Sequence, residues 1–101
     1  MRAILLAGLL AVLAASAAAE PPLRVGSKRF TESYILGEIV TQAARRAGEP
    51  AEHHPGLGNT AILLQALEQG AIDVYPEYTG TIAREILDVQ QDLALGALNE
   101  R

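Results

Sequence analysis

The sequence contains no cysteine and only four aromatic side chains among its 101 residues. Without cysteine the chain can form no disulfide bond, and it offers no thiol to carry the lipid of a bacterial lipoprotein. It also has few basic residues, and its formal net charge at pH 7 is -4. An acidic chain without a basic stripe is a poor binder of nucleic acid. These absences exclude a disulfide scaffold and argue against a nucleic-acid-binding protein.

One long apolar run is present, at the start of the chain. Residues 1–19 combine the positive charge of Arg2, an apolar run from Ala3 to Ala15 and a small-residue end of three alanines. This order is typical of a secretory signal peptide with an A-x-A cleavage site. An uncleaved membrane anchor is the alternative, but the run falls short of the roughly 20 residues that a spanning helix needs. We therefore predict a signal peptide over residues 1–19 and a periplasmic location.

Cleavage after Ala19 would leave 82 residues with a formal charge of -5, because Arg2 is lost. This length is enough for one small domain with a thin core. The last residues, from Asp88 onward, still show an amphipathic helical pattern with no stop signal except Gly96. We therefore predict that residues 20–101 are the N-terminal part of a longer protein.

Strand and helix patterns alternate along residues 20–101. LRVGS at Leu23–Ser27, AEHH at Ala51–His54 and AIDVY at Ala71–Tyr75 are predicted strands. Helical patterns separate the three strands. Right-handed crossovers would make a parallel three-stranded sheet with helices on its faces. The predicted fold class is therefore α/β, with three short parallel strands and flanking helices.

The helices are predicted from apolar spacing and from their end residues. Apolar side chains recur at three- and four-residue steps from Ile35 to Ala47, and a second stripe ends at Gly70. A third helix is expected to begin after Gly80 and to run through Leu93. The predicted N-caps are polar residues at the starts of the first two helices, namely Thr31 or Ser33 and then Asn59 or Thr60.

Three loops are expected where the strands end: SKRFTES, HPGLGNT and YPEYTGT. Open parallel sheets bind their ligands beyond the carboxyl ends of the strands, so these loops would line the ligand crevice. All four aromatic residues, Phe30, Tyr34, Tyr75 and Tyr78, fall in or beside the first and third loops. Packing at the rim of a small core is the alternative explanation. The helical stripes contain no aromatic residue beyond Tyr34, which favours a ligand site.

Lys28 is suited to bind an anion, whereas the third loop is suited to bind a cation. Lys28 precedes a helix N-terminus, where its ammonium and the open backbone N–H groups both favour an anion such as a carboxylate. A solvated surface lysine is the alternative. The ring face of Tyr78 can hold a cation, and Thr79 and Thr81 add hydroxyl groups. A ligand that carries both charges would use all of these groups.

GLGNTA, residues 56–61, matches the G-x-G-x-x-A form of the dinucleotide-binding motif, and Glu77 follows about twenty residues later. The strand before it is short and polar, and the motif follows the second strand, whereas the dinucleotide fold places it after the first. Export would also separate the protein from its nicotinamide pool. We therefore predict that Gly56 and Gly58 are turn residues. A nucleotide-binding oxidoreductase stays the alternative from another class.

Other combinations of catalytic residue types are weak. His53 and His54 are adjacent, so in a strand they point to opposite faces and cannot jointly bind one metal ion without a bend. Asp73 and Glu77 are separated by Pro76, which breaks the helix that would pair them. Asp73 is expected to end the strand or cap a turn, and Glu77 to brace the loop through hydrogen bonds. With no G-x-S-x-G or P-loop either, we predict no enzyme, no cofactor and no metal site.

GSKRFTESYILGEI (Gly26–Ile39) and LGNTAILLQALEQGAIDVYPEYTGT (Leu57–Thr81) are long, specific motifs. Together with the signal peptide, they resemble the glycine betaine/choline-type osmoprotectant substrate-binding proteins of ABC importers. The resemblance covers residues 20–101 as far as about Ile86. It implies a two-lobed periplasmic binding protein of the second structural type, of which this chain would be part of the first lobe. Such proteins close on their ligand by hinge motion and deliver it to a membrane permease.

The resemblance also implies roles for particular residues. The family holds a quaternary ammonium in a cage of aromatic rings and a carboxylate with basic and hydroxyl groups. Lys28 and Thr81 would contact the carboxylate, Tyr78 would be one wall of the cage, and Asn59 would be a further contact. Tyr75 would be a packing residue. Another small zwitterion, such as an amino acid, is the alternative ligand, and its N–H groups would need an acidic partner.

Overall fold

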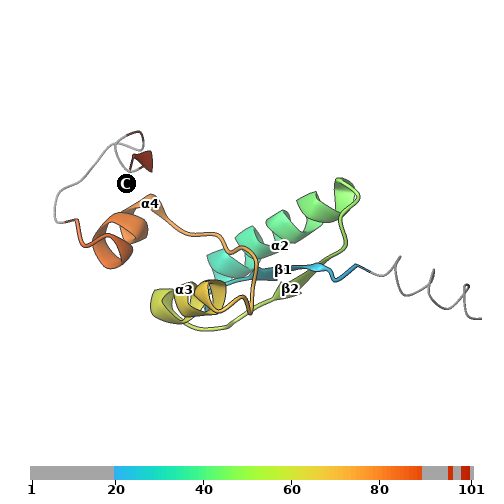
Figure 1. Ribbon diagram of the computed structural model, residues 1–101, viewed down its shortest axis with the longest axis horizontal. Coiled ribbons are helices and arrows are strands. Elements are labelled where there is room, and N and C mark those ends of the chain that lie inside the picture. Colours follow the sequence, from blue (N-terminus) through green and yellow to red (C-terminus); the bar gives the residue numbers. More distant parts are fainter. Residues whose placement is uncertain (1–19, 90–95, 97–98, 101) are drawn as a thin grey trace, which may run out of the picture.

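The computed structural model describes residues 20–89, 96 and 99–100. The predicted signal peptide and Leu93 therefore lie outside the described residues. Two parallel strands form the sheet, with Leu23 opposite Ala51 and Gly26 opposite His54. In chain order the elements are β1 (Leu23–Gly26), α2 (Thr31–Arg46), β2 (Ala51–His54), α3 (Thr60–Glu68), α4 (Thr79–Thr81) and the π-helical turn η1 (Ile82–Ile86), as Figure 1 shows. The predicted alternation of strands and helices is confirmed.

The third predicted strand, Ala71–Tyr75, is reduced to a single bridge between Val74 and Val25 of β1. Two backbone hydrogen bonds make this contact: Asp73 N–H donates to the Arg24 carbonyl, and Gly26 N–H donates to the Val74 carbonyl. The donor–acceptor distance is 2.9 Å in each. The Arg24 N–H instead donates to the Asp73 carboxylate over 2.8 Å. The ladder stops because a side chain has taken this backbone donor, so the prediction of a full third strand is wrong.

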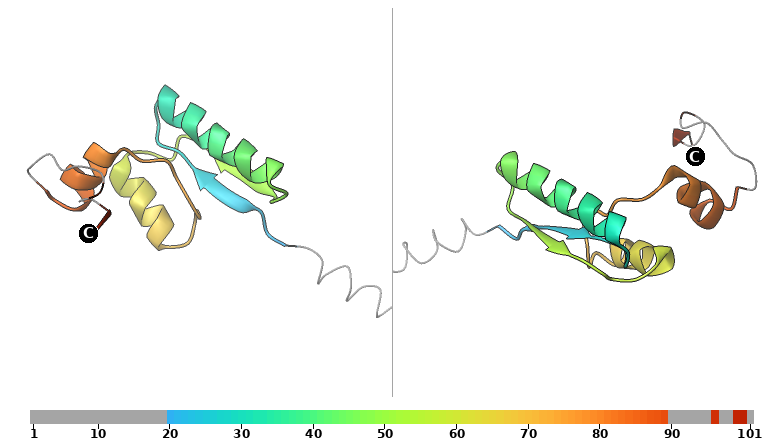
Figure 2. Two further views of the ribbon diagram at one scale, coloured as in Figure 1. Left: turned by 90° about the horizontal axis from the view of Figure 1, so that it is seen from above. Right: turned by 180° about the vertical axis from the view of Figure 1, so that it is seen from behind.

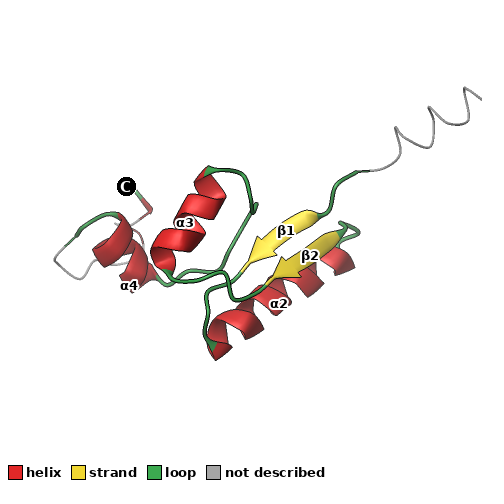
Figure 3. Cartoon of the chain, turned by 90° about the horizontal axis from the view of Figure 1, so that it is seen from below, coloured by secondary structure: helices red, strands yellow, loops and turns green. Residues whose placement is uncertain are grey.

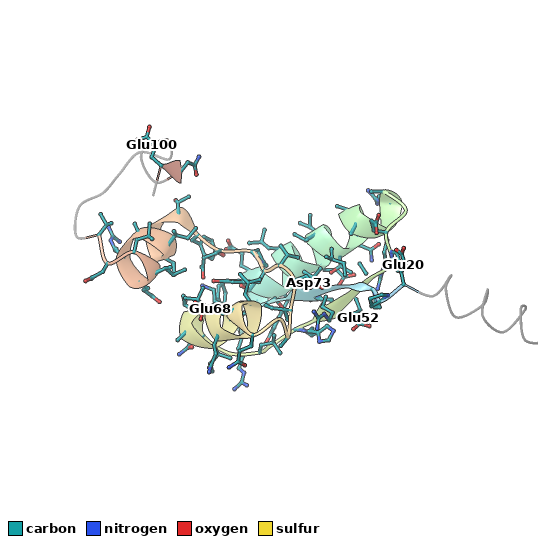
Figure 4. All side chains as sticks on the ribbon, viewed as in Figure 1. Glu20, Glu52, Glu68, Asp73 and Glu100 are labelled. Carbon is teal, nitrogen blue, oxygen red and sulfur yellow. The ribbon has the colours of Figure 1, made fainter. Side chains whose placement is uncertain are left out.

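Asp73 lies beside β1, as its label in Figure 4 shows. Its carboxylate also forms an ion pair with Arg24, with 3.0 Å between Oδ1 and Nη2. The Arg24 side chain and backbone N–H hold the pKa of Asp73 below its usual value. Asp73 therefore ties the third segment to β1 and, of the two roles expected for it, fits the end of a strand better than the cap of a turn.

Helix α2 lies on one side of the strands, and α3 lies on the other side (Figures 1 and 2). Gly37 lets α2 approach the sheet closely, because a Cβ at this position would meet His53 Nε2 at 2.5 Å. Phe30 is the N-cap, and no side chain caps the helix, so the prediction of Thr31 or Ser33 is wrong. Thr31 begins the helix, and Ser33 lies in its first turn with its side chain fully buried.

Helix α3 begins as predicted. Asn59 is its N-cap, and the Asn59 side chain accepts a hydrogen bond from Ile62 N–H over 3.2 Å. Leu63 is fully buried and lies against Gly26, where a Cβ would meet Leu63 Cδ1 at 3.1 Å and Ile72 Cδ1 at 2.7 Å. A small apolar core thus forms between α3, β1 and the segment that follows α3.

The predicted third helix is interrupted. The chain forms α4 and η1 in succession, and Asp88 then has a φ of 53°, in the left-handed region that ends a helix. The secondary-structure view of Figure 3 shows this short helical segment beyond the sheet and near α3. Among the described residues, no helix is long and apolar enough to cross a membrane.

Candidate functional site

Lys28 lies at the carboxyl end of β1, and its side chain reaches two later segments of the chain. The ammonium donates to Glu77 Oε1 over 2.6 Å and to Thr60 Oγ1 over 3.2 Å. The side chains of Lys28 and Glu77 are each only 7% exposed. The sequence prediction of Lys28 as a site residue left a solvated lysine as the alternative, and this burial excludes that alternative. Lys28 joins the first, second and third predicted loops.

Two aromatic rings flank the Lys28 ammonium. Nζ lies 5.6 Å from the ring centroid of Phe30 and 5.6 Å from that of Tyr78. The two rings are stacked, with 6.3 Å between their centroids and an angle of 24° between their planes. These distances are within the range of cation–π attraction. One aromatic residue of the first loop and one of the third therefore meet beside a positive charge.

Tyr78 is fixed at its hydroxyl end by Glu32 of α2. The hydroxyl donates a hydrogen bond to Glu32 Oε1. This bond, followed by burial and by the charges of Glu32 and Glu77, raises the pKa of Tyr78 to about 12. The phenol therefore stays neutral at physiological pH, and its ring is held beside Lys28.

Glu77 braces the third loop, as predicted. Besides the Lys28 ammonium, Glu77 Oε1 accepts the N–H of Tyr78 over 2.9 Å. Its second oxygen, Oε2, is buried and has no hydrogen-bond partner among the described residues. Burial first, and then the Glu77 carboxylate through its charge and hydrogen bonding, raises the pKa of Tyr75 to about 12. We name the group of Lys28, Phe30, Thr60, Glu77, Tyr78 and Glu32 the loop cluster.

An open hollow of about 730 Å³ adjoins the loop cluster. Three groups of residues line it. The first loop contributes Lys28, Arg29 and Phe30, the region around the start of α3 contributes residues 58–62, and η1 contributes Glu85. Two of the four predicted site residues, Lys28 and Asn59, therefore share one hollow. Tyr78 adjoins it through its contact with Lys28.

Thr81 is the predicted site residue that the described contacts leave apart. It is half-buried at the end of α4, and no described side-chain hydrogen bond joins it to the loop cluster. The first four residues of the motif GLGNTA connect β2 to α3, and Gly56 and Gly58 there have φ values of 69° and 146°. The prediction that these two glycines are turn residues is confirmed.

A second polar group lies between α2 and the two strands. Ser27 Oγ and His53 Nε2 are 2.8 Å apart, His53 Nδ1 and Glu38 Oε2 are 3.0 Å apart, and Gln42 donates to Glu38 Oε1 over 2.8 Å. We name these four residues the sheet cluster. The order resembles the serine, histidine and acid of a hydrolase, but Ser27 is fully buried. A sealed hydroxyl cannot attack a substrate, so we interpret the sheet cluster as structural.

Sequence reasoning missed Thr60 and Glu32 as members of the loop cluster. Thr60 had been considered only as a helix cap, and Glu32 carries no motif of its own. The hydrophobic and aromatic pattern gave no signal for either contact, because both depend on how α2 and the third loop meet in space. The adjacency of Thr60 to Asn59 was the one available hint.

An α/β unit whose polar and aromatic groups gather beyond the carboxyl ends of parallel strands is typical of small-molecule-binding proteins. The chain belongs to the OpuAC family, described as the substrate binding domain of ABC-type glycine betaine transport systems, which matches residues 21–100. The resemblance inferred from GSKRFTESYILGEI and from the third loop is confirmed. The family is one of substrate-binding domains.

Relatives with this sequence pattern come from several bacteria. The chain is 42% identical over 77 residues to the glycine betaine-binding protein YehZ of Escherichia coli, a match that covers 73% of this chain and 25% of that protein. It is 39% identical over 70 residues to a glycine-betaine-binding protein of Pseudomonas aeruginosa, covering 69% of this chain and 22% of that protein.

A third relative is the ergothioneine transport permease/ergothioneine binding protein EgtU of Helicobacter pylori. The two are 39% identical over 79 residues, which is 77% of this chain and 14% of EgtU. The solved structure of apo YehZ from Escherichia coli superimposes with a TM-score of 0.64 at 36% sequence identity, covering 72% of this chain and 26% of that one. The chain thus spans a quarter or less of the curated relatives that it matches.

Proposed function

We propose that the chain supplies one wall of the ligand cleft in the solute-binding component of an ABC importer. The ligand is a quaternary ammonium osmoprotectant, such as glycine betaine or choline. In glycine betaine, Lys28 and Thr81 contact the carboxylate. In either ligand, the Tyr78 ring faces the quaternary ammonium, and Asn59 adds a polar contact. The protein works in the periplasm and delivers the ligand to a membrane permease. Residues 20–101 form the N-terminal part of the first lobe of a type II binding fold.

The Lys28 ammonium beside the Tyr78 ring is the observation that carries this proposal. Lysine has three N–H donors, and the described hydrogen bonds to Glu77 and Thr60 use two of them. The third can take a ligand carboxylate at the edge of the hollow. The Tyr78 ring lies close enough to receive the cationic end of the same small molecule. The distance between the two groups suits a short zwitterion.

The strength of binding by this chain alone can be bounded. One cation–π contact contributes about 0.5–2 kcal/mol, and one hydrogen bond to a charged group about 1.5–3 kcal/mol. Their sum reaches about 5 kcal/mol, whereas a millimolar complex needs about 4 and a micromolar complex about 8. The chain alone therefore binds glycine betaine in the millimolar range or more weakly.

An NMR titration with glycine betaine tests the proposed site. Lys28 is the only lysine in the sequence, so selective ¹³C labelling at lysine Cε gives a single side-chain signal. We expect this signal and the Tyr78 ring signals to shift together, and we expect Tyr78→Leu to abolish the Lys28 shift. Tyr34→Leu, an exposed tyrosine outside the loop cluster, is the matched control and should keep the shift. An unchanged shift in Tyr78→Leu would contradict the proposal.

A zwitterion with N–H groups is the second candidate ligand. The observation that favours it is the buried Glu77 Oε2, which has no described partner and can accept a hydrogen bond. A quaternary ammonium has no N–H to donate, but an amino acid has three. Displacement of glycine betaine by glycine at equal or lower concentration, followed at the Lys28 signal, would support this second candidate.

A further inference from the structure

We propose that Glu77 is a specificity-determining residue, which makes the site accept a carboxylate only when the ligand also brings a positive charge. This inference rests on the proposed function, since it concerns the same site. It adds a reason for selecting zwitterions and cations against simple carboxylate anions. The ligand class follows from the charge balance around Lys28.

Carboxylates of the loop cluster offset the positive charge of the hollow. Lys28 and Arg29 are the cationic residues of the lining, and Glu85 is an acidic one. Glu77 and Glu32 add two carboxylates from the loop cluster, one bound to Lys28 and the other to the Tyr78 hydroxyl. Two positive charges thus face three negative charges among the described groups. The lining by itself has one more positive than negative charge, and the two carboxylates of the loop cluster offset this excess.

Burial makes the Lys28–Glu77 pair the decisive part of this balance. Both side chains are 7% exposed, and 2.6 Å separates Nζ from Oε1, so water screens the pair far less than it would at the surface. An ammonium without such a partner would attract any carboxylate. With Glu77 in place, a carboxylate that reaches the remaining N–H of Lys28 also approaches the Glu77 carboxylate, and like charges repel.

The second oxygen of Glu77 strengthens this effect. Oε2 is buried and makes no described hydrogen bond, and the neutral Tyr75 phenol, which interacts with the Glu77 carboxylate, does not offset its negative charge. A ligand ammonium beside Tyr78 brings positive charge toward this carboxylate. The attraction compensates for the repulsion that the ligand carboxylate meets. A zwitterion therefore satisfies both halves of the site, and a simple carboxylate satisfies only one.

The test compares acetate with glycine betaine in the ¹³C-lysine-labelled chain and in Glu77→Gln. Glutamine keeps an oxygen that can accept from Lys28 and from Tyr78 N–H, but it removes the negative charge. We expect acetate to shift the Lys28 signal of Glu77→Gln at about tenfold lower concentration than in the wild type. Glu68→Gln removes the same charge at the last residue of α3, which is exposed, and should leave acetate binding unchanged.

Equal acetate affinity in the wild type and in Glu77→Gln would overturn the inference. If Glu77→Gln fails to fold, the test uses the wild type alone. Glycine betaine must then shift the Lys28 signal at a lower concentration than acetate does, and a shift by acetate at the lower concentration overturns the inference. A wild type that does not respond to glycine betaine contradicts the proposed function. The acetate comparison between wild type and Glu77→Gln then still decides the role of Glu77.

Discussion

The loop cluster and the sheet cluster are both polar groups inside a small protein, but they differ in how completely they are satisfied. In the sheet cluster, Ser27, His53, Glu38 and Gln42 form an unbroken chain of hydrogen bonds across β1, β2 and α2. In the loop cluster, Glu77 Oε2 has no described partner, and one donor of Lys28 is not used by the described hydrogen bonds.

This difference is the reason why we assign a structural role to the sheet cluster and propose a binding role for the loop cluster. Buried polar atoms are nearly always hydrogen-bonded in folded proteins, so an unpaired atom calls for an explanation, and a binding role is one. The sheet cluster uses its hydrogen bonds to hold α2 on the strands. The loop cluster keeps bonding capacity beside an open hollow. The sheet cluster looks more like an active site in residue type, so the completeness of its hydrogen bonds is a better guide to its role than residue identity.

Replacing Lys28 by methionine should have the largest effect on stability. It leaves the buried Glu77 carboxylate without its counter-charge, which costs about 3–5 kcal/mol in comparable buried pairs. Urea unfolding, monitored by circular dichroism, measures the loss in the free energy of unfolding. Arg46→Met is the matched control, because Arg46 is exposed at the end of α2, and it should change the free energy of unfolding by less than about 0.5 kcal/mol. Similar values for the two variants would show that the loop-cluster ion pair contributes little.

Gly37→Ala should have the next largest effect, and it acts on the sheet cluster. The added Cβ would lie 2.5 Å from His53 Nε2 and 3.0 Å from Ser27 Cβ. Overpacking of this kind costs about 1–3 kcal/mol, more than alanine gains over glycine in a helix. Gly80→Ala, where nothing lies within 4 Å, is the control and should not destabilise. A stabilised Gly37→Ala variant would refute the close contact between α2 and the strands.

Ser27→Ala should cost about 1–2 kcal/mol, because it leaves His53 Nε2 without its partner in the buried part of the sheet cluster. Glu38→Gln changes the exposed end of the same chain of hydrogen bonds, and we expect a change within about 0.5 kcal/mol. Thermal unfolding of the two variants measures the difference between their losses of stability. A larger effect at Glu38 than at Ser27 would contradict the structural reading of the sheet cluster.

The smallest expected effect is spectroscopic and concerns the loop cluster. Phenolate absorbance should show Tyr78 ionising near pH 12, and Glu32→Gln should lower this pKa toward 10 by removing the charged acceptor. Because the folded pKa is raised, the stabilisation is complete below pH 10 and is lost as the pH rises toward 12. Tyr78→Phe identifies the signal. An unchanged Tyr78 titration in Glu32→Gln would show that this hydrogen bond does not form in solution.

Much of the architecture could be predicted because it depends on local pattern. β2 was predicted with the bounds that the structure shows, and the Asn59 cap and the glycine turn before α3 were also predicted. The third strand was wrong because the Asp73 side chain takes the Arg24 N–H, an event that a count of apolar residues does not contain. The α2 cap was wrong because the helix begins directly after Phe30 without a side-chain acceptor.

Some members of the loop cluster could be predicted from the sequence, but the contacts between them could not. Lys28 and Tyr78 were predicted from their places in the loops, and the structure brings them together. The burial of Lys28 against Glu77 and the hydrogen bond from Tyr78 to Glu32 join residues 49 and 46 positions apart in the chain. Contacts at such separation depend on the packing of whole elements, which single-sequence patterns do not encode.

The proposal that this chain carries one wall of a site for a quaternary ammonium zwitterion can be tested by isothermal titration of residues 20–101 with glycine betaine. The wall consists of one ammonium, one tyrosine ring and their polar neighbours, so we expect a dissociation constant in the millimolar range or weaker. A micromolar dissociation constant for this chain alone would show that the proposal is wrong.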